Sequence, residues 1–392
     1  MNEHRMTRAT FLRTCGALAT GIAIGRRVLP AAVADASALE PVRLKTWEVV
    51  ELPGRKEKFR SFIKITATSG AAGYCRALAG VKDLRAAEQT VAGTNLLDHE
   101  KLYDRMVAKG VPPSQLKIMD IACWDLHARM LGKPLHALLG TKKTKILRYG
   151  DVRGHQPGFS PQKYAQSVVS YFEHTGLEAT KLHFPGAMGT EDSILLKDVM
   201  ATLAAVREAV GVDKILAWDP YPRSAESATR SVDEARQIIR HMDELGYAWL
   251  EGPLSPVPYE TQIPKYAALV KLRPKLRIQA EGPRSPIGDG TSFADMVRWV
   301  EAGAVNQCST DAYIAGGLTN ALRMMEYARN HPEKQLVINL HWAWAPHAHL
   351  VMAYDDRVCP IAEFPMTEDI PKKYLDGPYL LAPDWPGIYR ID

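Results

Sequence analysis

Three short apolar runs that each end in one carboxylate constrain the fold of this chain more than any other feature. The runs end at Asp219, Glu251 and Glu281, which are 32 and then 30 residues apart. Segments of helical periodicity, such as 231–246, lie between them. This spacing is about one strand–helix unit, so consecutive parallel strands would bring all three carboxylates to one rim of a sheet.

Carboxylates that converge in a sheltered site repel one another unless a cation lies between them. Oxygen ligands favour a hard cation, so we predict a Mg²⁺ site made of Asp219, Glu251 and Glu281. The competing interpretation is that each acid pairs with a lysine or arginine side chain of a neighbouring loop.

The residues after 145 alternate between strand-like and helical segments. Eight apolar strand candidates occupy 146–151, 179–184, 215–221, 248–254, 277–283, 304–311, 335–341 and 361–364. This alternation predicts an α/β fold, a closed (β/α)8 TIM barrel whose site lies at the C-terminal ends of the strands. An open doubly wound sheet would need a glycine-rich phosphate turn after its first strand, and residues 150–154 do not form one.

The residues before the barrel predict a separate α+β domain. Residues 42–77 alternate between apolar and polar side chains, as in a sheet with one solvated face. Helical periodicity follows at 83–92, 98–109 and 113–139, and Gly132 and Pro134 interrupt the last of these. We therefore divide the chain into an α+β domain at 41–145, a barrel at 146–365 and a C-terminal segment at 366–392.

The predicted strand ends carry acid–base groups beside the carboxylates. Lys181 and His183 end the second barrel strand, and period two places both on the same side, in the barrel mouth. Asp311 and His341 end the sixth and seventh strands, where the carboxylate would fix the imidazole tautomer and raise its basicity. Lys181, partly desolvated and near a cation, could have a lowered pKa and act as a base.

Two candidate acid–base groups that flank one metal ion suit removal of a proton next to a carboxylate. The competing interpretations are that His341 is a structural histidine and that Lys181 is a surface lysine. His183 remains open between a proton donor, a substrate contact and a space-filling side chain.

Composition excludes several classes of function. The 392 residues are 46% hydrophobic and 24% charged, with a net charge of +5, which does not indicate a nucleic-acid partner. The charge is compatible with a small anionic substrate. No run of 18 apolar residues follows the first forty, so we predict no membrane span in the mature protein.

The first forty residues have the pattern of an export signal. Arg5, Arg8 and Arg13 precede a short apolar run at 15–25, and a small-residue cleavage site follows at 32–34. The segment resembles a twin-arginine signal with alanine in place of the second arginine. We expect a periplasmic protein; a disordered basic tail on a cytoplasmic protein is the alternative.

The cysteines indicate no metal site and no disulfide that folding requires. Cys75, Cys123, Cys308 and Cys359 are far apart in the chain. Cys123 and Cys308 lie in apolar runs, and we expect both to be core thiols.

Residues 42–392 resemble the enolase superfamily and, within it, the mandelate racemase subgroup. The resemblance rests on the order of several motifs together with the three carboxylates: 120–126 with 132–134 and 138–140, 181–183, 311 with 316–319, and 339–341. It implies a modified barrel with an N-terminal α+β capping domain and an essential Mg²⁺ ion at Asp219, Glu251 and Glu281. It also implies a His341–Asp311 dyad that faces Lys181.

The resemblance further implies that Glu363 stabilises the substrate carboxylate and that the loop between the first two strands covers the barrel mouth. Arg55 and Arg60 lie in that loop and are our candidates for substrate binding. This chain has His183 where the family commonly has lysine. The region of Tyr313 also lacks the lysine of muconate cycloisomerases, which argues against that subgroup.

The reaction that we predict is the Mg²⁺-dependent dehydration of a sugar acid to a 2-keto-3-deoxy acid. Removal of the proton alpha to the carboxylate would precede loss of the β-hydroxyl group. A racemase or epimerase of a carboxylic acid would use the same groups without elimination, and a barrel that binds a carboxylate without turnover is the second alternative. We also expect a homo-oligomer.

Overall fold

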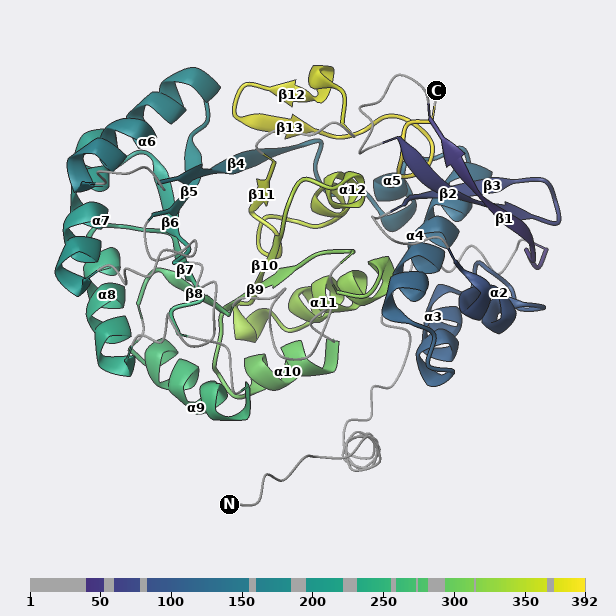
Figure 1. The fold of residues 1–392 in the computed structure, drawn as a ribbon, viewed down its shortest axis with the longest axis horizontal. Coiled ribbons are helices and arrows are strands. Elements are labelled where there is room, and N and C mark those ends of the chain that lie inside the picture. The colour runs from purple at the N-terminus through teal and green to yellow at the C-terminus, as the bar shows by residue number, and fades with distance from the viewer. Residues whose placement is uncertain are drawn as a thin grey trace.

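The computed structural model describes residues 40–391 except 53–59, 78–82, 155–159, 185–194, 221–230, 255–258, 273, 281–292, 314 and 365–369. Figure 1 shows a ring of strands surrounded by helices, with a smaller sheet and its helices beside α11 and α12. No helix within the described ranges is long and apolar enough to span a membrane.

The N-terminal domain is a three-stranded antiparallel sheet packed on helices. Its elements are β1 (Leu44–Glu51), β2 (Ser61–Ala67), β3 (Ala72–Arg76), α2 (Arg85–Val91), α3 (His99–Ala108), α4 (Pro113–Met130) and α5 (Leu135–Leu139). Buried side chains occur around the whole circumference of α4, because it lies between the sheet and α11. Gly132, whose φ is 63°, follows the end of α4 and turns the chain. Pro134 is the N-cap residue of α5.

Eight parallel strands form the barrel within the described ranges, as predicted. They are β4 (Lys145–Arg153), β5 (Ala179–His183), β6 (Ile215–Trp218), β7 (Trp249–Glu251), β8 (Arg277–Ala280), β9 (Gln307–Thr310), β10 (Val337–Leu340) and β11 (Ile361–Glu363). Each strand from β4 to β9 pairs with the next, and β11 pairs with β4. The backbone N–H of Ile338 donates to Val358 O, just before β11, at 2.8 Å.

Helices cover the outside of the barrel between successive strands (Figure 1). They are α6 (Pro161–Thr175), α7 (Leu196–Val210), α8 (Val232–Glu244), α9 (Tyr259–Val270), α10 (Phe293–Glu301), α11 (Leu318–Asn330) and α12 (Ala345–Ala353). The amphipathic helix α8 begins at a capping box in which Ser231 accepts from the Glu234 N–H. Two short helices, η3 (Pro332–Lys334) and η4 (Lys372–Tyr374), and the strands β12 (Leu375–Asp376) and β13 (Tyr379–Leu381) complete the structure.

The floor of the barrel consists of inward-facing apolar side chains. Tyr149, Ala179, Ala217 and Trp249 form one cluster there. Because side chains alternate along a strand, the residues two positions later face the same interior one level higher. This places Asp151, Lys181, Asp219 and Glu251 in one layer at the barrel mouth.

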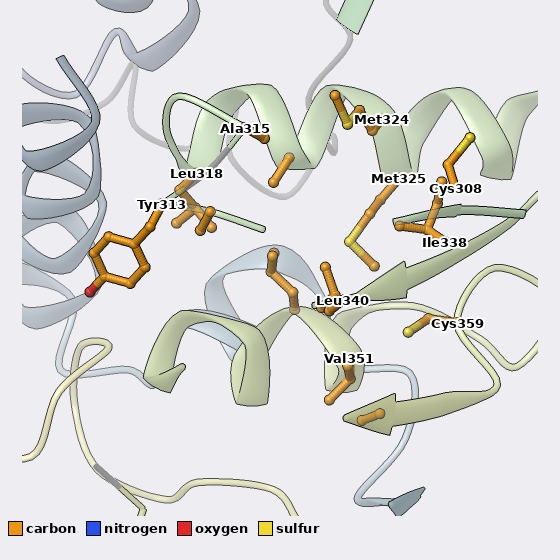
Figure 2. Packing of buried hydrophobic residues seen from close by; sticks show 14 of the residues in the cluster. Cys308, Tyr313, Ala315, Leu318, Met324, Met325, Ile338, Leu340, Val351 and Cys359 are labelled. Atoms are coloured by element: carbon orange, nitrogen blue, oxygen red, sulfur yellow. The ribbon is translucent and has the colours of Figure 1, made fainter. Parts of the chain in front are cut away.

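A second apolar cluster supports the strands that end at Asp311 and His341. Figure 2 shows side chains from α11, β9, β10 and α12 that gather behind these strands, among them Met325, Ile338 and Leu340. Cys308 and Cys359 lie in the same region as buried free thiols. Cys123 is also buried, so both cysteines predicted to be core residues are confirmed as such.

The C-terminal segment returns to the N-terminal domain. The strand β13 pairs antiparallel with the start of β4, and Gly387 O accepts from Leu135 N at 3.1 Å. Asp125 Oδ1 on α4 accepts from Ile388 N at 2.6 Å. These contacts join the C-terminal segment to α4, α5 and the first barrel strand.

Gly73 of β3 is expected to tolerate no side chain. A Cβ atom there would lie 2.6 Å from Leu126 Cβ and 2.7 Å from Leu126 N, and closer still to Ala122 O. Because the obstruction is the backbone of α4, we expect Gly73→Ala to lower the free energy of unfolding by at least ~3 kcal/mol. Gly377→Ala is the matched control, where nothing lies within 4 Å and φ is 53°, and we expect a cost of about 1 kcal/mol. Urea unfolding of both variants measures the difference, and equal midpoints would contradict this packing.

Candidate active site

Lys181, Asp219 and Glu251 meet at the C-terminal ends of three neighbouring strands. All three side chains are buried. Lys181 Nζ lies 3.2 Å from Glu251 Oε2 and 3.7 Å from Asp219 Oδ2. The lysine therefore bridges two of the carboxylates that the spacing in the sequence predicted to converge.

Burial and mutual charge shift the ionisation of this cluster. Burial raises the pKa of Asp219 to about 6, and burial also raises the pKa of Glu251. Burial alone would lower the pKa of Lys181, but Glu251 and Glu363 outweigh it and raise that pKa well above its usual value. The lowered lysine pKa expected from the sequence assumed a cation beside it, whereas the described side chains around it are carboxylates.

The donor set fits a hard divalent cation as far as it is described. Asp219 and Glu251 offer carboxylate oxygens from adjacent strands, which Mg²⁺ prefers. The third predicted ligand, Glu281, lies outside the described residues. Within the described ranges, no group of three histidine, cysteine, aspartate or glutamate side chains could hold a metal ion.

Glu363 at the end of β11 closes the cluster on its other side. Its Oε2 lies 3.7 Å from Lys181 Nζ and accepts from the Tyr149 hydroxyl at 3.4 Å and from Trp342 N at 3.3 Å. Burial would raise the pKa of Glu363, but Lys181 and His341 hold it below its usual value. The residues described here therefore favour the ionised form.

His341 and Asp311 form the predicted pair at the ends of β10 and β9. His341 Nδ1 lies 3.4 Å from Asp311 Oδ2, and the His341 backbone N–H donates to Thr310 O at 2.8 Å. Asp311 is buried, whereas the His341 side chain is 28% exposed. Burial lowers the pKa of His341, but the hydrogen bond with Asp311 and the charge of Glu363 outweigh it and raise that pKa above its usual value.

Sequence reasoning missed three groups that surround the Asp311 carboxylate. Trp344 Nε1 donates to Oδ2 at 2.8 Å, and Tyr313 N donates to Oδ1 at 2.6 Å. His347 on α12 has its Nε2 3.7 Å from Oδ1 and accepts from Ala312 N at 2.9 Å. The signal in the sequence was the concentration of tryptophan and histidine just after His341.

His183 lies beside the first metal-ligand candidate. Its Nδ1 is 3.6 Å from Asp219 Oδ2, and burial together with the charge of Lys181 lowers its pKa to about 4. A neutral imidazole at neutral pH is a poor proton donor, which favours a role as a substrate contact. Asp151 of β4, another residue that we missed, lies in register with Lys181 and pairs with Arg153 at 2.7 Å.

The capping-loop cations are only partly described. Arg55 lies outside the described residues. Arg60 pairs with Glu51 at 3.2 Å where β1 meets β2, and both side chains are exposed. Its assignment to substrate binding stays a prediction.

The arrangement as a whole places two proton-transfer groups near buried carboxylates. Lys181 projects from β5, and His341 follows β10 across the barrel mouth. One is an amine among carboxylates, and the other is an imidazole paired with a carboxylate. This constellation can remove a proton on one side of a bound molecule and deliver one on the other.

Comparison with known sequences agrees with this geometry. A family model described as enolase C-terminal domain-like matches residues 163–388, more than half of the chain. The chain is 26% identical over 268 residues to L-talarate/galactarate dehydratase of Salmonella typhimurium, covering 66% of this chain and 59% of that protein. It is 29% identical over 231 residues to hydrophobic dipeptide epimerase of Roseobacter litoralis, covering 59% of this chain and 58% of that protein. Both matches span less than two thirds of the relative's length.

Comparison with solved structures supports the fold. The structure of D-glucarate dehydratase from Agrobacterium tumefaciens, complexed with magnesium, superposes with a TM-score of 0.69 at 22% identity. The match covers 90% of this chain and 97% of that one. The fold class predicted from the sequence, a modified barrel with a capping domain, is confirmed.

Proposed function

Because this chain belongs to the enolase superfamily, we propose that it is a Mg²⁺-dependent enzyme that dehydrates a sugar acid to a 2-keto-3-deoxy acid. The relatives named above include a dehydratase and an epimerase, so lyase and isomerase chemistry are the two classes to separate. The observation that carries the proposal is the placement of Lys181 and the His341–Asp311 pair around Asp219 and Glu251.

Mg²⁺ would be held by Asp219 and Glu251, with Glu281 as the third predicted ligand, and would stabilise the negative charge that develops on the substrate carboxylate. Lys181 moves the proton at the alpha carbon. Removal of that proton requires the neutral amine, and a nearby positive charge favours the neutral form.

His341 serves the opposite step of the dehydration. Its imidazolium form is stabilised by Asp311 and donates a proton to the departing β-hydroxyl group. Glu363 is our candidate for contact with the substrate carboxylate, whose negative charge would oppose the ionised form of Glu363 that Lys181 and His341 favour. Lys181 and Asp311 are buried, whereas the His341 side chain is 28% exposed.

A racemase or epimerase is the second candidate, because the same two groups could act on one carbon in turn. The 29% identity to a dipeptide epimerase supports this second candidate. In that case the proton returns to the alpha carbon and no hydroxyl group is lost.

The test of the proposed function is incubation with a panel of sugar acids in the presence of Mg²⁺. We expect at least one acid to yield a 2-keto acid, detected as its semicarbazone. Deuterium uptake from D₂O into recovered acid without keto-acid formation would instead support an epimerase. Neither signal with any acid would contradict the proposal and leave a barrel that binds a carboxylate without turnover.

We also propose that the protein is exported to the periplasm. The support is the arginine-rich start, the short apolar run and the small residues at 32–34, all of which lie outside the described residues. N-terminal sequencing of the native protein should begin near Asp35. A cytoplasmic protein that retains Met1 would contradict this prediction.

A further inference from the structure

The Asp311 carboxylate is divided between two groups of partners. Its Oδ1 accepts from Tyr313 N at 2.6 Å and lies 3.7 Å from His347 Nε2. Its Oδ2 is shared between Trp344 Nε1, at 2.8 Å, and His341 Nδ1, at 3.4 Å. The indole N–H therefore makes the shorter contact with the same oxygen that faces the proposed catalytic imidazole.

The ring of Trp344 is itself held from the N-terminal domain. The Arg76 guanidinium, at the end of β3, lies over the indole with its carbon 4.7 Å from the ring centroid. Tyr313 packs against the ring edge-to-face at 5.1 Å. Arg76 is 8% exposed, so its charge acts on the indole in a largely desolvated setting, where cation–π attraction is strongest.

We propose that Arg76 and Trp344 are positioning residues that link the N-terminal sheet to the His341–Asp311 pair, with Arg76 fixing the indole and the indole N–H fixing Asp311 Oδ2. The inference rests on the proposed function, because it assigns a role within that site. Neither residue needs to touch the substrate.

The linkage has a chemical consequence at His341. When an N–H donates to a carboxylate, less of the carboxylate's negative charge is available to its other partners. Loss of the indole donor leaves Tyr313 N on Oδ1 and His341 as the remaining partner named above on Oδ2, so Oδ2 turns towards the imidazolium and binds it more strongly. We expect Trp344→Phe, which keeps a ring under Arg76 and removes only the donor, to make His341 harder to deprotonate.

Other charges facing His341 must be considered in that experiment. They are Asp311 after β9, Glu363 on β11, Lys181 on β5, His347 on α12, and Asp219 and Glu251 at the ends of β6 and β7. Trp344→Phe alters none of these groups, and Mg²⁺ is kept constant, so a change in His341 reports the lost indole bond.

The measurement is the rate at which diethylpyrocarbonate modifies His341 between pH 5 and pH 8, followed by peptide mass spectrometry in the presence of Mg²⁺. The reagent attacks only neutral imidazole, and exposed His174 serves as the reference in the same sample. At the acid end, modification of His341 in Trp344→Phe should be slower by up to about tenfold, which corresponds to one pKa unit. An unchanged or faster rate would overturn the proposal.

Trp47→Phe is the matched control. Trp47 Nε1 donates to Glu88 Oε2 at 3.0 Å in the N-terminal domain, so this variant also loses one indole–carboxylate bond. The control should leave modification of His341 at the wild-type rate. An equal effect of both variants would show a general loosening of the protein and would overturn the specific role of Trp344.

The role of Arg76 is tested by asking whether the effect of replacing it requires the indole of Trp344. Arg76→Met should slow modification of His341 at the acid end, as Trp344→Phe does, and Arg76→Lys should keep part of the wild-type rate. In the Trp344→Phe background, Arg76→Met should add nothing, because no indole N–H remains to be aimed. Additive effects would overturn the linkage. If Trp344→Phe folds poorly, the two Arg76 variants in the wild-type background decide, and an unchanged His341 rate in Arg76→Met would overturn the linkage.

The kinetic readout separates this inference from the proposed function. On an acid that the wild type dehydrates, Trp344→Phe should lower kcat about tenfold with KM unchanged, less than the ~10²–10⁴-fold expected for loss of the acid itself. If the wild type turns over no acid, the proposed function fails, while the modification rates still decide whether Trp344 positions Asp311.

Discussion

Lys181→Ala is expected to lose both dehydration and exchange of the alpha proton with solvent, whereas His341→Asn is expected to lose dehydration and retain exchange. The reason is the division of labour across the barrel mouth. Without the base no proton leaves the alpha carbon, but without the acid the proton still leaves and returns while the hydroxyl group stays. Each loss should be on the order of 10²–10⁴-fold.

The two variants are compared by deuterium exchange from D₂O and by keto-acid formation on the same substrate. His174→Asn and Lys373→Ala, at exposed positions, are the matched controls and should behave as the wild type. The opposite pattern in the two site variants would exchange the roles of Lys181 and His341. Full turnover in both would place the chemistry elsewhere.

Replacement of Glu251 by glutamine should lower the affinity for Mg²⁺ and abolish turnover while the fold survives. The amide keeps the size of the buried side chain but cannot supply the negative charge that a hard cation prefers. The change also removes the ion pair that Lys181 makes at 3.2 Å, so the amine loses the partner that places it. Both effects act on the same step, and we expect at least ~10³-fold loss.

Titration calorimetry with Mg²⁺ gives a readout that does not depend on activity, and thermal unfolding checks that the variant is folded. Glu208→Gln on the exposed face of α7 is the control and should bind Mg²⁺ like the wild type. Full activity after exhaustive treatment with a chelator would contradict the metal assignment altogether. Wild-type Mg²⁺ affinity in Glu251→Gln would remove Glu251 from the proposed ligand set.

The local pattern of the sequence was enough to predict the barrel and the layer of charged groups at its mouth. Apolar runs about 30 residues apart indicate parallel strands joined by helices, and period two then decides which residue of each run faces the interior. Lys181, Asp219 and Glu251 follow from these two rules alone, and their contacts in the structure agree with the predicted convergence. The resemblance to the enolase superfamily added the expectation that a His341–Asp311 dyad faces Lys181 and that Glu363 contacts the substrate.

The same local rules could not predict how ionisation is distributed in the site. The low pKa of His183 depends on burial together with the charge of Lys181 on the same strand. The raised pKa of Lys181 depends on carboxylates from other strands, and neither burial nor those charges are encoded by spacing within one segment. The lowered pKa suggested for Lys181 beside a cation stays a prediction, and the carboxylates that surround the amine act in the opposite direction.

The surroundings of Asp311 were decided by tertiary structure. Trp344 and His347 reach it because α12 begins just after β10, and Arg76 reaches Trp344 from a different domain. A strand end and its direction are properties of a few consecutive residues, and the sequence by itself determined them. Which indole donates to which carboxylate depends instead on packing between segments far apart in the chain, where a shift of about 1 Å breaks the bond.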